Sequence, residues 1–228
     1  AFGHHEARDS VDYPDNDLRR RSAGAAFKTR HGEWATAWLA GASRKTFGAR
    51  GYYGVNPAWP AEETYEDALL LGTVRRGEVG RFYRRVTGVW RVTDDAYALF
   101  IDGADPFRNQ HRARMSTVAC DGRERMSEAW ALQWRGAYAF EGVDGNNLGD
   151  HDRERYTVLA LPEWTHGRLR CSAEIMGEVF SDGQAFALPQ AGLALRLAHR
   201  HELYAAYTEA VHEPSYTELG YESPGSLG

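Results

Sequence analysis

Apolar and polar residues alternate with a period of two along much of this chain. Between residues 168 and 178, apolar side chains share one parity, and charged or small side chains share the other. The two sets are Leu169, Cys171, Ala173 and Ile175, and Arg168, Arg170, Ser172, Glu174 and Glu178. Because successive side chains of a strand point to opposite faces, this pattern predicts a β-strand with one apolar and one hydrated face.

The same alternation recurs along the chain and predicts an all-β protein. It is clear at Leu193, Leu195 and Leu197, and again from Trp130 to Tyr138. Helical spacing of apolar residues is rare by comparison. About ten strands are predicted from this period, near residues 18–29, 33–47, 64–76, 80–101, 107–120, 126–140, 153–164, 168–180, 185–198 and 201–212.

The connections between these strands alternate in length. Short polar turns are predicted at residues 30–32, 76–78, 121–123, 165–167 and 199–201, and longer links at 48–63, 102–106, 141–152 and 181–184. Tight turns at one end and longer loops at the other are typical of an antiparallel up-and-down sheet. The sequence therefore predicts a meander in which each strand pairs with its neighbours along the chain.

A period of two is compatible with a soluble sandwich or propeller as well as with a transmembrane β-barrel. Two features favour lipid on the apolar side. The opposite parity carries charges or small residues rather than a second hydrophobic set. Aromatic residues also gather near strand ends, as in interfacial girdles: Trp90, Phe100, Phe107, Trp164, Tyr204 and Tyr207.

Composition excludes several classes of protein. The 228 residues are 43% apolar, which indicates a folded chain. The 27 basic and 32 acidic residues are mixed, so no basic block is present and nucleic acid is not an expected partner. The two cysteines, Cys120 and Cys171, lack the spacing of a zinc site. No run approaches ~18 apolar residues, so no transmembrane helix is predicted.

Four stretches that are distributed along the chain have recognisable motifs. They are KTFGARGYYGVNPAWPAEETYE at 45–66, ALFIDGADPFRNQHR at 98–112, GNNLGDHDRERY at 145–156 and PSYTELGYESPGSLG at 214–228. In this order they resemble the TonB-dependent outer-membrane receptors, and especially their cobalamin-receptor-like branch.

This resemblance implies that residues 1–228 are the central part of a barrel of about 22 strands, without the plug domain or the C-terminal strands. The implied function is import of a scarce nutrient, such as a siderophore, cobalamin or a similar chelate, across the outer membrane of a Gram-negative bacterium. Extracellular loops would capture the ligand, and the TonB-ExbB-ExbD complex would supply energy through the plug domain. No cofactor and no enzymatic activity are expected.

The loop from residue 48 to residue 60 is the best candidate for ligand contact. Its glycines permit sharp turns, and its aromatic residues offer amphipathic contact area. The candidate residues are Tyr52, Tyr53, Asn56 and Trp59. The alternative is that these aromatic residues only anchor the loop at the membrane interface.

A second candidate is a calcium site in the segment DGNNLGDHD. Asp144, Asn146, Asp150 and Asp152 carry the oxygen ligands that calcium prefers. The segment lacks the spacing of an EF-hand, so a solvated loop is the alternative interpretation.

Two other functions stay open at this stage. One is a small, self-contained outer-membrane barrel enzyme, although no nucleophile or carboxylate-pair motif is present. The other is a soluble β-sandwich that binds carbohydrate through Trp34, Trp38, Trp130 and Trp134.

Overall fold

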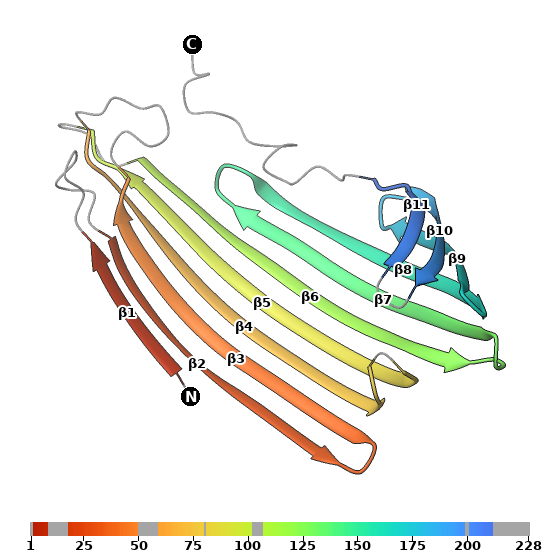
Figure 1. Ribbon diagram of the computed structural model, residues 1–228. Coiled ribbons are helices and arrows are strands. Elements are labelled where there is room, and N and C mark those ends of the chain that lie inside the picture. Colours follow the sequence, from red (N-terminus) through yellow and green to blue (C-terminus); the bar gives the residue numbers. More distant parts are fainter. Residues whose placement is uncertain are drawn as a thin grey trace.

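The computed structural model describes residues 2–8, 18–49, 59–79, 81–101, 107–198 and 201–211. They form a single sheet of eleven strands (Figure 1). The strands are β1 (Phe2–Arg8), β2 (Leu18–His31), β3 (Trp34–Gly48), β4 (Ala61–Gly77), β5 (Tyr83–Leu99), β6 (Phe107–Arg125), β7 (Trp130–Gly145), β8 (Gly149–His166), β9 (Leu169–Phe180), β10 (Ala185–Ala198) and β11 (His201–Thr208). Within these ranges no helix is long and apolar enough to cross a membrane.

The strands follow one another across the sheet in chain order, and every neighbouring pair is antiparallel. This arrangement confirms the predicted up-and-down fold. Figure 1 shows long strands side by side in a curved sheet, with β9, β10 and β11 curling away from the direction of β2 to β6. In the described part of the chain, β1 and β11 each have one partner and form the two edges.

The cross-strand register places the apolar parity of every strand from β2 to β11 on one face. Residues that are directly opposite one another in neighbouring strands share a face. One such row crosses five strands and consists of Phe27, Trp38, Gly72, Gly88 and Val118. We call this side the apolar face, and the side with the intervening residues the polar face.

Solvent exposure of the two faces is opposite to that of a water-soluble sheet. Large apolar side chains on the apolar face are open, including Val158 at 66%, Leu203 at 63% and Phe27 at 60%. The buried strand residues, such as Leu99 and Phe180, share the polar parity instead. The polar face is therefore the crowded, concave side, and the apolar face is the convex side that no part of the described chain covers.

Charged residues border the apolar face at both ends of the strands. On β3, the side chains between Trp34 and Arg44 on this face are uncharged. That separation is about 33 Å along the strand, or about 25 Å across a membrane at a tilt of ~40°. Such a height matches the apolar band of outer-membrane barrels, which is ~25 Å.

The border is uneven from strand to strand. It falls in register with Arg44 at Asp94 on β5 and Asp144 on β7, but nearer the turn end at Arg114 on β6 and Glu154 on β8.

Aromatic residues lie near the turn-end limit of the band and inside it. Trp130 of β7 is directly opposite Trp164 of β8, close to the short turns, which is a position that an interfacial girdle requires. Tyr138 and Tyr156 are also opposite each other, with ring centroids 5.2 Å apart, and belong to the same row as Trp38 inside the band.

Two of the predicted connections are wrong. Gly122 lies inside β6 rather than in a turn, because the Trp134 ring of β7 lies over it, about where a side chain would otherwise be. The turn is at residues 126–129, where Ser127 Oγ accepts hydrogen bonds from the amides of Ala129 and Trp130. The link predicted over 141–152 is also mostly strand, and only residues 146–148 connect β7 to β8.

Other turns are confirmed. Gly32 and Gly167 lie in two-residue hairpin turns with φ angles of 58° and 57°, in the left-handed region that glycine adopts without strain. The turn at Gly77 and the link at 181–184 are also present. We refer to the end of the sheet with Gly32 and Gly167 as the turn end, and to the opposite end as the loop end.

Candidate functional site

Ion pairs connect neighbouring strands across the polar face. Arg91 Nε of β5 lies 2.6 Å from Asp67 Oδ1 of β4. Arg85 donates to both carboxylate oxygens of Asp121 on β6, each at 3.0 Å. Further pairs on this face are Arg123 with Glu163, and Arg153 with Glu141. Arg91 and Asp67 lie in the middle of their strands, whereas the other pairs lie within five residues of a strand end. The polar face is therefore hydrated or covered by polar groups.

The apolar face shows a different distribution. Its ion pairs, among the residues described, occur toward the strand ends. They are Arg44 with Glu66 and Arg112 with Asp94 toward the loop end, and Arg84 with Glu124 and Arg76 with Glu33 at the turn end. This difference between the faces separates a lumen from a lipid-facing surface, because an ion in hydrocarbon is costly and an ion in a water-filled lumen is not.

A buried polar cluster lies on the polar face toward the loop end of β4, β5 and β6. Its members are Glu63, Asp95, Tyr97, Asn109 and His111. Glu63 and Asn109 are only 4% and 6% exposed. His111 Nε2 lies 3.2 Å from Asp95 Oδ2, while Asp95 Oδ1, Asn109 Oδ1 and His111 Nδ1 have no hydrogen-bond partner within the described ranges. Since buried polar atoms normally have partners, this cluster is suited to binding a further polar group.

A cationic hollow of about 490 Å³ lies on the same face toward the turn end. Lys28, Arg30, Arg75 and Arg85 line it together with small side chains of β3. Arg30 contacts Glu78 at 3.3 Å and Arg85 is held by Asp121. Lys28 and Arg75 form no ion pair with any residue that the structure describes. The hollow is therefore electropositive and suits an anionic group.

Of the predicted ligand-contact residues in the 48–60 loop, only Trp59 lies among the residues that the structure describes. Tyr52, Tyr53 and Asn56 lie outside the described residues. Trp59 packs, half-buried, against a small cluster of Ala49, Ala61 and Leu99. The amide of Ala49 donates to the carbonyl of Ala61 at 2.8 Å, which closes the base of the loop. Trp59 thus has a packing role at this base.

The calcium candidates lie in a tight hairpin rather than in the open loop that was expected. Asp144 and Asp150 are directly opposite each other, and Asp152 is opposite Gly142. Asn146 accepts from the amide of Gln110 at 2.8 Å and donates to the carbonyl of Arg108 at 2.7 Å, so it ties the hairpin to β6. In the described ranges no group of three or more His, Cys, Asp or Glu residues is placed to hold a metal ion.

The four tryptophans of the carbohydrate-binding alternative lie on the apolar face. Trp38 lies over Gly72, and Trp134 lies over Gly122. Trp34 and Trp130 are about half exposed near the turn end. Neither this set nor any other tryptophan lines the cationic hollow.

The sequence pattern did not single out the buried polar cluster or the cationic hollow. The signal in the sequence that relates to both is the recurrence of charged residues on one parity of the strands.

No protein-family model and no curated protein sequence matches the chain. Solved structures that match the chain include a receptor and two autotransporter domains. BauA, the ferric preacinetobactin receptor from Acinetobacter baumannii, superposes with a TM-score of 0.65 at 9% identity, over 90% of this chain and 41% of that chain. The chain therefore spans less than half the length of BauA.

Two autotransporter domains are more distant. The translocator domain of NalP from Neisseria meningitidis has a TM-score of 0.39 at 12% identity, over 86% of this chain and 75% of that chain. The beta domain of the Bordetella autotransporter BrkA has a TM-score of 0.40 at 13% identity, over 90% and 88%. The likeness to BauA shows the fold: an all-β, antiparallel, up-and-down sheet of the outer-membrane β-barrel type.

Proposed function

We propose that this chain is part of the wall of a TonB-dependent receptor in the outer membrane of a Gram-negative bacterium. The carrying observation is the shape and facing of the sheet, whose open convex face is apolar and whose concave face holds the mid-strand ion pair of Arg91 and Asp67. The superposition on a ferric siderophore receptor over 90% of the chain supports the same assignment. The four sequence stretches in family order add to it.

The edges of the sheet support a larger barrel. A strand edge in hydrocarbon leaves N–H and C=O groups unpaired, which bilayers do not tolerate. In the proposed receptor, further strands pair with β1 and β11, and the apolar face becomes the outer surface of a closed barrel of about 22 strands.

The polar face supports a route for an anionic cargo. Ferric siderophores and cobalamin-like chelates carry polar or charged groups, and the cationic hollow at Lys28 and Arg75 suits such groups. In this proposal the loop with Tyr52, Tyr53, Asn56 and Trp59 makes early contact with the nutrient. The chain acts by binding and passage, without covalent chemistry.

Energy comes, in this proposal, from the TonB-ExbB-ExbD complex, which acts on a plug domain inside the barrel. Uptake of labelled ferric chelates by cells with the full receptor tests the assignment. Uptake should require both the receptor gene and functional TonB. Uptake that persists without TonB would contradict TonB-dependent transport. Absence of the receptor from the outer-membrane fraction of these cells would contradict the proposed location.

A further inference from the structure

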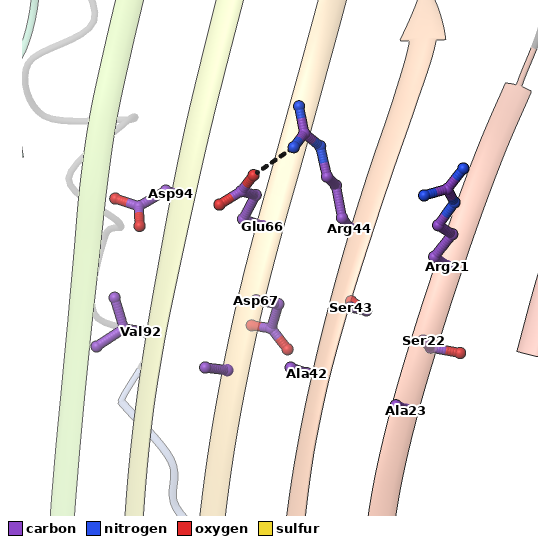
Figure 2. Close-up of a pocket in the computed structure, with 11 residues that line it drawn as sticks. Arg21, Ser22, Ala23, Ala42, Ser43, Arg44, Glu66, Asp67, Val92 and Asp94 are labelled. Atoms are coloured by element: carbon purple, nitrogen blue, oxygen red, sulfur yellow. Dashed lines mark ion pairs between the residues drawn. The ribbon is translucent and has the colours of Figure 1, made fainter. Parts of the chain in front are cut away.

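A shallow hollow of about 480 Å³ lies on the apolar face where this face meets the charged border of the loop end (Figure 2). Its floor is a row of directly opposed small side chains, Ala23, Ala42 and Ala68, which ends at Val92. The next row toward the turn end is small on β2 and β3, at Ala25 and Ala40, and large on β4 and β5, at Leu70 and Trp90. The alanines therefore form a depression that larger side chains border on the side of β4 and β5.

The charged row above the floor is unevenly paired. Arg21, Arg44, Glu66 and Asp94 are directly opposed in that order across β2 to β5. Arg112 forms an ion pair with Asp94 and donates hydrogen bonds to both of its carboxylate oxygens, at 2.6 and 3.0 Å. Glu66 has one contact with Arg44, at 3.3 Å, drawn in Figure 2. Arg21 forms no ion pair with any residue of the described ranges.

Arg21 and Arg44 thus place two like charges opposite each other on one face. Like charges in this position are destabilising, and an anion between them removes the repulsion. Figure 2 shows both side chains extending beyond the alanine floor on the loop-end side. The rim also holds the carboxylates of Glu66, Asp67 and Asp94, each of which is paired with an arginine. Arg21 is therefore the charge of the rim that has no ion pair in the described ranges, and the apolar floor lies below it.

We propose that this hollow binds a phosphorylated lipid from the leaflet at the loop end. One acyl chain of this lipid lies over Ala23, Ala42 and Ala68. Atoms that line an empty groove lose dispersion contacts, and an acyl chain in the groove restores these contacts. The lipid phosphate lies between Arg21 and Arg44. The inference rests on the membrane-spanning barrel proposed above, but it concerns the outer surface and not the transport route.

The test uses the full receptor purified in detergent, with diphosphoryl lipid A as the probe and native mass spectrometry as the readout. The double variant Arg21→Gln and Arg44→Gln should bind lipid A roughly tenfold or more weakly, because charge-assisted hydrogen bonds are lost. Ala42→Leu fills the floor and should also weaken binding while the charges remain. The matched control is Arg20→Gln, because Arg20 is adjacent in β2 but belongs to the polar face.

Heat-modifiable migration on an electrophoresis gel establishes that each variant is a folded barrel, so a failed barrel proposal is seen separately from a failed lipid site. Unchanged lipid A binding by the double variant would overturn the lipid site. Equal weakening by Arg20→Gln would also overturn it. If inorganic phosphate displaced bound lipid A as effectively as unlabelled lipid A does, the hollow would be a site for free anions. That result would contradict the proposal that an acyl chain contributes to binding.

Discussion

At the scale of single residues, glycine has two different functions in this sheet. Gly32 and Gly167 reverse the chain through positive φ angles. Gly72 and Gly122 instead lie within strands under the rings of Trp38 and Trp134. The indole covers the backbone that lacks a side chain, an arrangement known to stabilise glycine in sheets.

Strand glycines that lie under an aromatic ring and strand glycines that have open space above them should respond differently to substitution by alanine, which is expected to lower the stability of the first kind only. At Gly122, a new Cβ would lie 2.8 Å from the Tyr83 carbonyl and 2.9 Å from the Trp134 ring, whereas at Gly136 it would meet nothing within 4 Å. Gly122→Ala should destabilise the full receptor by about 1–3 kcal/mol. Gly136→Ala should be neutral or stabilise by about 0.5–1 kcal/mol. Urea unfolding in lipid vesicles measures both, and equal effects would contradict the ring-over-glycine packing.

The facing of β10 gives a second test at single residues. Leu193, Leu195 and Leu197 share the apolar face, and Arg196 lies on the polar face opposite Glu202. Leu195→Arg should cost the full receptor up to about 2–4 kcal/mol, depending on its depth in the bilayer. Arg196→Leu should cost little, because it removes one exposed charge from the polar side. The same vesicle unfolding assay compares the two variants, and the reverse order would mean that the faces are wrongly assigned.

At the scale of elements, ten of the strands follow from alternation alone, because each has one apolar and one polar face. β1 was not predicted, since its seven residues, FGHHEAR, contain no regular alternation. Only its pairing with β2 defines it as a strand. The buried cluster that includes Asp95, Asn109 and His111 was also not predicted. Alternation shows that these residues share a face, but their contact depends on the register between strands and not on any local motif.

The loop after β3 gives a prediction at this scale. Trp59 packs at the base of the loop, so Trp59→Ala should alter both the loop and the local packing of Ala61 and Leu99. Replacing Tyr52 and Tyr53 by alanine should weaken nutrient uptake without lowering the amount of receptor in the membrane. Uptake assays and membrane immunoblots on the same cells measure both effects. Unchanged uptake in the double variant would leave these tyrosines as interfacial anchors.

At the scale of the whole molecule, the two edge strands set the behaviour of residues 1–228 when they are expressed alone. Each unpaired backbone group in hydrocarbon costs several kcal/mol, so an edge of several residues exceeds the typical net stability of ~5–15 kcal/mol. After refolding in detergent, this segment should be heterogeneous and should migrate on a gel as unfolded protein without heating. A uniform, heat-modifiable monomer that inserts into liposomes would contradict the larger-barrel proposal and favour a small barrel.

The chain-order pairing of the sheet also has a consequence for how such a barrel forms. Every strand contacts its immediate neighbours in sequence, so each hairpin closes only a short loop and the entropy lost at each step is small. In the proposed closed barrel, a single contact breaks this rule, namely the seam between the first and last strands. That seam joins residues from the far ends of the barrel sequence and carries by far the largest loop-closure cost. We therefore expect sealing of the seam, and not zipping of the hairpins, to limit the rate at which the barrel is completed.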